Sequence, residues 1–527
     1  MEFGKGFFVA LFVILLSLTV VFGPGAGVSG AMDCSTAAFQ ALPLFDEQFG
    51  KPVTGLTATP VAAGPEVPAY CDVRGTMWPE IKFQVVLPST TWNGKFYMAG
   101  GGGFDGRIPN LNTGLALRYA TAGCDSGHDG AKEPLATFAY NPPDNSNPNA
   151  GQKKLDFAFR SYRETALLAK KIVKAFYGRD ARYSYWVGCS EGGREALLMA
   201  QRFPELFDGI VVGAPILDLT GAHMWSLWNA QALLGSGSIQ VSQLPLLAKA
   251  VYAKCDGIDG LVDGLIDDPR ACHFDPVTDL PTCDSPSPSC FTTGQIEALK
   301  KIYNGVKTSK GGRLFPGEPF GAEVLAPESG WEHWIIGNPS RQQLFGDSSM
   351  KFLCLEPQPG PAWTWKEYNF DTDPPRMAAA SLLFDMVNPD LRPFKARGGK
   401  MIHYHGWGDT ALTPLMSVNY YESVMKVMGE KETKEFYKLY MVPGMFHCGG
   451  GVGCFDGNRD VDVVKLVNAV AAWVEKGIAP EAIVGSRIVD NRVVRTRPLC
   501  PYPEVEKYSG KGDIDKAENF TCVMPAK

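Results

Sequence analysis

Three residues that lie far apart in the 527-residue sequence carry the groups needed for covalent acyl transfer. Ser190 lies within Gly-Cys-Ser-Glu-Gly at residues 188–192, and Asp409 and His447 follow it along the chain. A serine hydroxyl is a weak nucleophile at neutral pH, so it needs a base, and the base needs an acid that orients it. The pattern Gly-x-Ser-x-Gly, followed by Asp and then His, predicts Ser190 as nucleophile, His447 as general base and Asp409 as the orienting acid.

Buried strands are predicted just before all three residues, at 184–188, 400–405 and 436–441. A helical pattern at 191–203 begins directly after Ser190, which gives the Gly-x-Ser-x-Gly pattern its required strand–turn–helix setting. Of the seven histidines, only His447 falls on a loop after a late strand. His403 and His405 lie within or at the edge of a strand, and we expect them to pack or to bond locally.

The order of predicted elements indicates an α/β fold. Further strands are predicted at 81–88, 95–99 and 209–213, and further helices at 155–177 and 461–476. Strands that alternate with helices predict a mostly parallel sheet with helices on both faces, as in the α/β-hydrolase fold. This rhythm fails between 219 and 393. We therefore expect one catalytic domain, built from 32–218 and 394–527, with an inserted lid domain at 219–393.

Acyl transfer also needs hydrogen-bond donors aimed at the oxyanion that develops on the carbonyl oxygen. The backbone N–H of Glu191, directly after the nucleophile, is one expected donor. A run of four glycines at 100–103 follows the strand predicted at 95–99, and Gly102 or Gly103 is expected to supply the second. The alternative is that the glycine run is only a flexible loop.

The N-terminus has the composition of an export signal. A short charged segment is followed by an apolar run from Phe7 to Phe22 and by small residues, which predicts a signal peptide at 1–31, with an uncleaved anchor as the alternative. We therefore expect a secreted or periplasmic protein without stable membrane association after cleavage. A net charge of -6 without long runs of one sign argues against nucleic acid as a partner.

Thirteen cysteines in an exported chain predict disulfides, and their odd number leaves at least one unpaired within the chain. Cys189 precedes the expected nucleophile and Cys448 follows the expected base, so these two cysteines can pair if the nucleophile and the base meet. Local pairs are expected between Cys255 and Cys272, Cys283 and Cys290, and Cys500 and Cys522. Candidates for two more bridges are Cys34, Cys71 and Cys124, which compete for one, and Cys354 with Cys454.

The cysteine-flanked triad resembles the tannase and feruloyl esterase family. The same resemblance includes the glycine run, Asp-Ser-Gly-His at 125–128 and Gly-Trp-Gly-Asp at 406–409, and it extends from about Cys34 to Cys522. It implies hydrolysis of esters of aromatic acids, such as feruloyl or galloyl esters, through an acyl-enzyme on Ser190. The small aromatic ester is thus the expected partner, and the oligomeric state stays open.

An acidic stretch in the expected lid domain has the composition of a cation site. Residues 256–268 hold five aspartates and three Asp-Gly pairs, and such a cluster repels itself unless a cation neutralises it. Ca²⁺ takes six to eight oxygens from carboxylates and carbonyls. The resemblance implies a structural Ca²⁺ bound by the carboxylates and backbone oxygens of Asp256, Asp259, Leu261, Asp263 and Leu265. A solvated acidic turn is the alternative.

The lid segment also supplies aromatic residues that could hold a planar acyl group. Its candidates are Trp331, Trp334, Trp363 and Trp365, of which at least two are expected to form the core of the lid instead. Arg376 is a candidate to face a substrate carboxylate. Two other functions remain: a binding protein without catalytic activity on a hydrolase scaffold, and a serine peptidase, since the same triad also cleaves amides.

Overall fold

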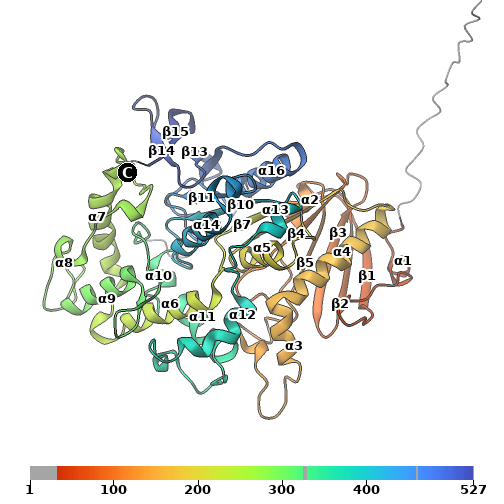
Figure 1. Ribbon diagram of the computed structural model, residues 1–527, viewed down its shortest axis with the longest axis horizontal. Coiled ribbons are helices and arrows are strands. Elements are labelled where there is room, and N and C mark those ends of the chain that lie inside the picture. The colour runs from red at the N-terminus through yellow and green to blue at the C-terminus, as the bar shows by residue number, and fades with distance from the viewer. Residues whose placement is uncertain (1–31, 325–328, 458–460, 526–527) are drawn as a thin grey trace, which may run out of the picture.

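A nine-stranded, mostly parallel sheet forms the centre of the molecule (Figure 1). The computed structural model describes residues 32–324, 329–457 and 461–525. The strand order is β1-β2-β3-β5-β4-β6-β7-β10-β11, with antiparallel pairing from β1 to β5 and parallel pairing from β5 to β11. The strands are β1 Thr54–Val61, β2 Tyr70–Met77, β3 Ile81–Pro88, β4 Lys95–Ala99, β5 Ala120–Cys124, β6 Tyr183–Cys189, β7 Gly209–Gly213, β10 Lys400–Gly406 and β11 Tyr437–Val442.

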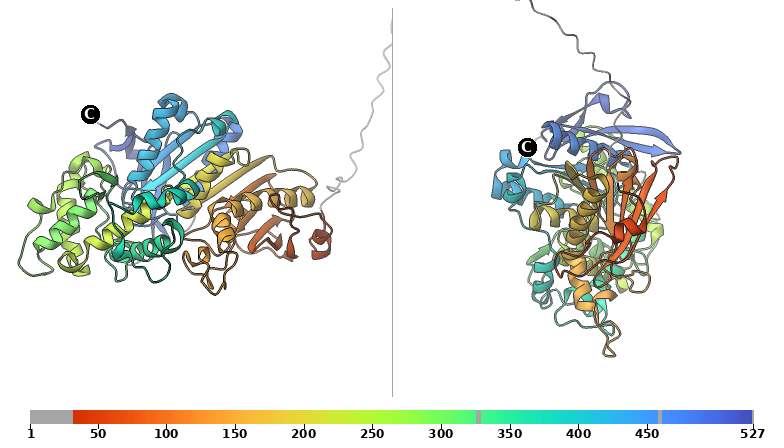
Figure 2. Two further views of the ribbon diagram at one scale, coloured as in Figure 1. Left: turned by 60° about the horizontal axis from the view of Figure 1, so that its bottom comes forward. Right: turned by 90° about the vertical axis from the view of Figure 1, so that its right-hand side faces the viewer.

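Helices cover both faces of the sheet, and each face has its own apolar core (Figure 2). The first face packs against α4 Ser161–Tyr177, α5 Glu191–Arg202, α13 Arg392–Ala396 and α14 Leu415–Met428. The second face packs against α2 Asn112–Ala116 and α16 Val461–Lys476. The central strands are apolar on both sides because both sides are covered, and this burial drives their pairing. The expected α/β-hydrolase fold is confirmed.

The chain between β7 and β10 leaves the sheet and forms a largely helical body, coloured green to teal in Figure 1. It has a third apolar core, centred on residues such as Leu247, Leu299 and Trp331. Its longer helices are α6 Leu219–Ala232, α7 Leu244–Cys255, α9 Thr293–Asn304, α11 Arg341–Ser349 and α12 Ala378–Phe384, and α10 Trp331–Trp334 is a single turn. A short hairpin, β8 Val306–Lys307 with β9 Arg313–Phe315, lies in the same segment.

Two small antiparallel ribbons follow α16 and lie together beside the sheet (Figure 1). They are β12 Ile483–Val489 with β13 Arg492–Leu499, and β14 Val505–Tyr508 with β15 Phe520–Val523. The remaining short helices are α1 Thr36–Gln40, α3 Ala150–Leu155, α8 Pro276–Asp279 and α15 Glu430–Lys434.

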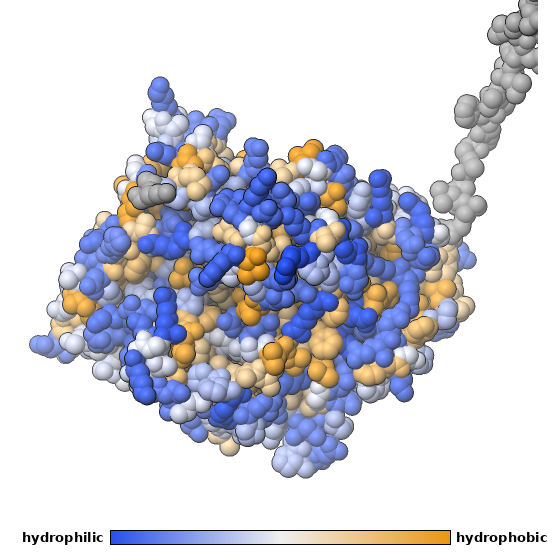
Figure 3. All heavy atoms as spheres, in the orientation of Figure 1, coloured by the Kyte–Doolittle hydropathy of each residue, from blue (hydrophilic) through white to orange (hydrophobic). Residues whose placement is uncertain are grey.

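The surface facing the viewer in Figure 3 is mostly hydrophilic, with hydrophobic side chains in small scattered groups. In the described ranges, no helix is both long enough and apolar enough to span a bilayer. The signal peptide expected at 1–31 lies outside the described residues.

Candidate active site

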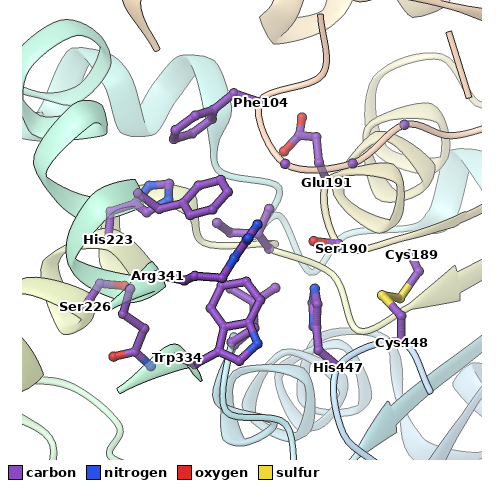
Figure 4. Close-up of a pocket in the computed structure, with 18 of the residues that line it drawn as sticks. Phe104, Cys189, Ser190, Glu191, His223, Ser226, Trp334, Arg341, His447 and Cys448 are labelled. Carbon is purple, nitrogen blue, oxygen red and sulfur yellow. A yellow bond between two sulfur atoms is a disulfide. The ribbon is translucent and has the colours of Figure 1, made fainter. Parts of the chain in front are cut away.

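Ser190 sits on a sharp turn between β6 and α5. Its backbone has φ 64° and ψ -120°, a conformation that a residue with a side chain adopts only when its surroundings force it. A Cβ atom on Gly188 would lie 2.4 Å from the carbonyl oxygen of Gly192, so the turn needs glycine at that position. The strain lifts the Ser190 hydroxyl above the carboxyl ends of the strands, into the cavity that His447 also lines (Figure 4).

Asp409 and His447 are hydrogen bonded to each other. Nδ1 of His447 lies 2.8 Å from Oδ2 of Asp409, which leaves Nε2 of the imidazole for the serine side of the site. The amides of Ala411 and Leu412 donate to Oδ1 of Asp409, at 2.9 and 3.0 Å. Burial alone would raise the pKa of the Asp409 carboxyl, but His447 and the hydrogen bonds from His405 and His447 lower it below its usual range. Asp409 therefore stays ionised and fixed.

His405 is a second histidine on the same carboxylate, a role that the sequence did not indicate. Its Nε2 lies 3.1 Å from both Oδ2 of Asp409 and the carbonyl oxygen of Leu412. Both of these oxygens only accept, so Nε2 carries a proton, and Nδ1 lies 2.7 Å from the hydroxyl oxygen of Ser417. His403, by contrast, bonds Tyr437 and lies in the core as expected.

A disulfide joins the residue before Ser190 to the residue after His447. Cys189 and Cys448 are bonded, with their Cα atoms 5.9 Å apart, and the bridge lies beside the serine and the histidine in Figure 4. Cys448 has φ 63°, so both ends of this connection border strained backbone. The bridge links the turn after β6 to the loop after β11, which are 259 residues apart in sequence.

The four-glycine run lines the same cavity, together with Glu191. A Cβ on Gly102 would meet no atom within 4 Å, and one on Gly103, whose φ is 63°, would lie 3.7 Å from the ring of Phe345. The backbone of Glu191 begins α5 directly beside Ser190. The structure thus brings together the three positions expected to carry the oxyanion donors.

The cavity has a volume of about 450 Å³ and is walled by aromatic rings. Phe104 comes from the glycine loop, and Trp334 and Phe345 come from the segment between β7 and β10. The guanidinium of Arg341 stacks over Trp334 and Phe345, at 5.1 and 5.6 Å from their ring centres. The ring of Trp334 also packs edge-on against His447, with ring centres 5.7 Å apart.

Arg341, and not Arg376, is the arginine of this segment that lines the cavity. Arg376 forms an ion pair with Asp373 at 2.9 Å and lies elsewhere, so the expectation that it faces the substrate was wrong. Of the four tryptophans considered, only Trp334 lines the cavity. Trp331 is fully buried in the core of the segment, and Trp363 and Trp365 pack against the first apolar core.

The acidic stretch at 256–268 forms a compact loop. The carboxylate of Asp256 accepts from the amides of Asp263 and Gly264, both at 3.1 Å, and Asp263 pairs with Arg497. The carboxylates of Asp259 and Asp263 also accept from the amides of Leu261 and Leu265, at 3.1 and 3.2 Å.

Asp267 adds an acid that was not among the expected ligands of the loop. Its Oδ2 is buried without a hydrogen-bond partner. Burial, with added repulsion from Asp259 and Asp263, raises the pKa of Asp267 well above its usual range. Glu506 on β14 faces the same cluster, and its pKa is raised by burial and by Asp267.

A second acidic group lies behind the turn at Ser190. Carboxylate oxygens of Asp105, Glu191 and Glu195 lie within 4.8 Å of one another, so this group could hold a metal ion. Within the described ranges it is the one place where three such ligand atoms from different residues come so close. No sequence pattern connects Asp105 with the helix that carries the two glutamates, so this group could not be predicted.

Five disulfides are present among the described residues. Besides Cys189–Cys448 they are Cys34–Cys71, Cys255–Cys272, Cys283–Cys290 and Cys500–Cys522. Cys124, Cys354 and Cys454 are free and buried, so the expected bridge between Cys354 and Cys454 is not formed. Cys124 and Cys354 lie in the first core, whereas Cys454 lies beside Gly485 of the β12–β13 ribbon.

Comparison with known proteins agrees with this geometry. Residues 65–523 match the family described as tannase and feruloyl esterase. The chain is 33% identical to the mono(2-hydroxyethyl) terephthalate hydrolase of Piscinibacter sakaiensis, over 89% of this chain and 87% of that protein. It is 30% identical to the probable feruloyl esterase B-1 of Aspergillus flavus, over 84% of each. The crystal structure of an esterase from Aspergillus oryzae matches with a TM-score of 0.76 at 27% identity, over 89% of this chain and 96% of that one.

Proposed function

The chain is a carboxylic ester hydrolase of the tannase and feruloyl esterase family, and on that premise we propose that it cleaves esters of aromatic acids through an acyl-enzyme on Ser190. The observation that carries this proposal is the hydrogen bond between His447 and Asp409, next to a serine held on a strained turn. These are the parts of a nucleophile–base–acid triad.

The proposed reaction has two halves. His447 accepts the hydroxyl proton of Ser190 as the serine oxygen bonds to the ester carbonyl carbon. The resulting oxyanion is held by the N–H of Glu191 and an N–H of Gly102 or Gly103. When the carbon–oxygen bond to the alcohol breaks, His447 gives its proton to the leaving alcohol. Water then attacks the acyl-enzyme with His447 again as base, which releases the acid and restores Ser190.

The walls of the cavity support an aromatic acyl group. Phe104, Trp334 and Phe345 offer ring faces for a planar acid. The guanidinium of Arg341 contacts two of these rings and makes no ion pair or hydrogen bond with any residue that the structure describes, so its charge is available to a ligand. Burial lowers the pKa of His223, which also lines the cavity, to about 3, so this histidine is neutral. We therefore propose an acyl ring that carries a carboxylate or another electron-rich substituent.

We propose that the acidic loop at 256–268 holds a structural Ca²⁺. Oδ2 of Asp267 is buried there without a hydrogen-bond partner, and the carboxylates of the loop repel one another. A bound cation would relieve both effects. We propose that Asp256, Asp259 and Asp263 supply carboxylates and that the carbonyls of Leu261 and Leu265 complete the site. The ion would supply positive charge that holds the loop folded, away from Ser190.

We further propose that residues 219–393 act as the lid domain over a catalytic domain built from 32–218 and 394–527. Trp334 and Arg341 bring this segment into the cavity, which supports that division. Five disulfides are typical of a protein that folds in an oxidising compartment. We propose that residues 1–31 are a signal peptide and that the enzyme is secreted or periplasmic.

The test is turnover of feruloyl, galloyl and monoterephthaloyl esters by the wild type and by Ser190→Ala. The variant should lose at least about a thousandfold in kcat on every ester, because triad members act as a unit, and it should keep its melting temperature. Arg341→Ala should raise KM most for the monoterephthaloyl ester, whose ring carries a carboxylate. Most of the wild-type kcat remaining in Ser190→Ala would exclude this mechanism.

A further inference from the structure

The glycine loop at 100–103 is hydrogen bonded to α5, the helix after the nucleophile, through both the N–H and the carbonyl of Gly101. The N–H of Gly101 donates to Oε2 of Glu195 at 3.1 Å, and its carbonyl accepts from the N–H of Gly192 at 3.1 Å. The N–H of Gly100 donates to the carbonyl of Val187 at 2.9 Å. Among the described residues, the amides of Gly102 and Gly103 donate no hydrogen bond, so they remain available at the cavity.

The backbone of Gly100 and Gly101 packs so closely against its neighbours that neither residue has room for a side chain. A Cβ on Gly100 would lie 3.0 Å from Oε2 of Glu195, and one on Gly101 would lie 2.3 Å from a carboxylate oxygen of Asp105. Asp105 belongs to the same loop, and its amide donates to the carbonyl of Gly102 at 3.1 Å. The loop therefore folds around two carboxyl groups, one of its own and one from α5.

Among the described residues, Arg194 is the cation that acts on these buried carboxyl groups. Arg194 is fully buried on α5, and its Nε donates to Oε1 of Glu191 at 2.7 Å. That pairing leaves Asp105 and Glu195 facing each other, with carboxylate oxygens within 4.8 Å, and Oδ1 of Asp105 and Oε1 of Glu195 are buried without a hydrogen-bond partner among the described residues. Two carboxylates cannot bond to each other, because neither has a hydrogen to donate, whereas one retained proton would give both oxygens a partner.

The electrostatics agree with this geometry. Burial, with repulsion from Glu191, raises the pKa of Glu195 to about 8. Burial, followed by Glu195 and Glu191, raises the pKa of Asp105 well above its usual range. The other groups that face the pair are the hydroxyl of Tyr162 on α4, 3.5 Å from Asp105, and the thiol of Cys124 on β5, and burial raises the pKa of both.

We propose that Asp105 and Glu195 are positioning residues for the oxyanion hole: the protonated carboxyl of Asp105 donates to Glu195, and Glu195 holds the amide of Gly101. This arrangement turns the following amides toward the cavity, where the oxyanion forms. The inference rests on the proposed acyl-transfer function. Neither side chain lines the cavity, so both act through the loop and not by touching the substrate.

Two variants of Glu195 and a matched control test the proposal, with a chromogenic nitrophenyl ester of an aromatic acid as substrate. Glu195→Ala removes the acceptor for Gly101 and should lower kcat by about ten- to a hundredfold with little change in KM, since loss of one oxyanion donor costs about 100- to 1,000-fold. Glu195→Gln keeps an oxygen acceptor and should recover most of that loss. The control is Glu164→Ala, another buried glutamate that accepts backbone amides, which should lower the melting temperature but not kcat.

The dependence of kcat on pH distinguishes a proton shared by Asp105 and Glu195 from a contact that is only structural. Wild-type kcat should fall at alkaline pH, because the pair then loses the proton on Asp105 and the two carboxylates repel. Asp105→Asn donates from an amide that cannot ionise, so this decline should disappear. Full kcat in Glu195→Ala would overturn the proposal, as would an unchanged alkaline decline in Asp105→Asn.

A metal ion bound by the same carboxylates would give a different result. Loss of activity at every pH in both Asp105→Asn and Glu195→Gln would overturn the shared proton and point to a bound metal ion in its place. If Ser190→Ala stays active, the proposed function itself fails. If Ser190→Ala is inactive while Glu195→Ala is fully active, only the positioning role of Asp105 and Glu195 fails.

Discussion

Nε2 of His405 lies 3.1 Å from Oδ2 of Asp409, the same oxygen that binds Nδ1 of His447. His405 is thus a second histidine hydrogen bonded to the acid of the proposed triad. His405 cannot reach the substrate, since it is fully buried and does not line the cavity. Its effect must pass through the orientation and charge of the carboxylate.

His405→Ala should lower kcat by about tenfold and leave KM nearly unchanged. The variant removes a hydrogen bond to a charged group, which is worth about 1.5–3 kcal/mol, and frees Asp409 to turn away from His447. Steady-state kinetics on an aryl ester measure both constants. His403→Ala is the matched control, because His403 lies on the same strand but is hydrogen bonded to Tyr437 and not to Asp409. A fall in kcat as large in the control as in His405→Ala would contradict this role.

Replacing both Cys189 and Cys448 by serine should lower kcat by up to about a hundredfold. The bridge fixes the residues next to the nucleophile and the base, and a small misplacement of a catalytic group can cost that much. The control is the Cys500 and Cys522 pair, which joins the end of β13 to β15, far from Ser190. Loss of that pair should lower the melting temperature with little change in kcat. Equal kcat values for the two double variants would show that the first bridge does not position the triad.

Chelation should lower the melting temperature if the acidic loop holds Ca²⁺, because an ion bound only by the folded state stabilises it by mass action. Asp259→Asn should give the same shift without chelator. Asp263 is a poorer choice for this variant, since it also pairs with Arg497. Metal analysis of the purified protein provides the independent check. The absence of calcium, combined with an unchanged melting temperature in chelator, would remove the site.

Asp218, the N-cap of α6 at the border of the lid segment, should make the stability of the protein depend on pH. Burial, with repulsion from Asp385, raises its pKa to about 7 from an ordinary value of 3.8. A carboxyl whose pKa is raised by folding favours the folded state at low pH, and this contribution is lost as the pH rises from about 4 to about 7. Asp218→Asn keeps the side-chain cap on Gly221 but cannot ionise. Its melting temperature should therefore fall less than that of the wild type over this range.

The control for this prediction is Asp144→Asn, a change in an exposed loop, which should leave the slope of melting temperature against pH nearly unchanged. Identical slopes for Asp218→Asn and the wild type would show that the buried carboxyl does not govern this dependence.

The buried parallel strands could be predicted because their apolar runs are continuous. The strand expected at 95–99 matches the parallel strand β4, and the helix expected at 461–476 matches α16. The strand expected at 81–88 matches β3, which is antiparallel to both of its neighbours. β5, with the sequence Ala-Thr-Ala-Gly-Cys, could not be found because small residues carry little hydrophobic signal, although the sheet buries every one of them. Tertiary packing, and not local preference, makes this segment a strand.

Some residues of the site could likewise be predicted from the sequence, and others could not. Ser190, Asp409 and His447 follow recognisable strands, so their order along the chain pointed to a common edge of the sheet. Arg341 and Trp334 lie in the segment between β7 and β10, whose irregular pattern gives no indication of which faces turn toward the cavity.

Two wrong expectations have the same origin. Arg376 was a candidate to bind a substrate carboxylate, but its guanidinium forms a local ion pair with Asp373 instead. Cys354 and Cys454 were candidates for a bridge, but both are free and buried in the structure. Contacts between residues distant in sequence depend on the packed structure, which spacing alone does not reveal.

The Cys189–Cys448 bridge also sets an order of events in biosynthesis. Cys448 is made 259 residues after Cys189, so the link cannot form until the ribosome has finished most of the polypeptide. Its formation also requires an oxidant, and cytosolic thiol buffers oppose it. On the proposed export route, a chain still in the reducing cytosol would therefore hold its serine and histidine without this covalent connection, and full hydrolytic competence would arise only after export.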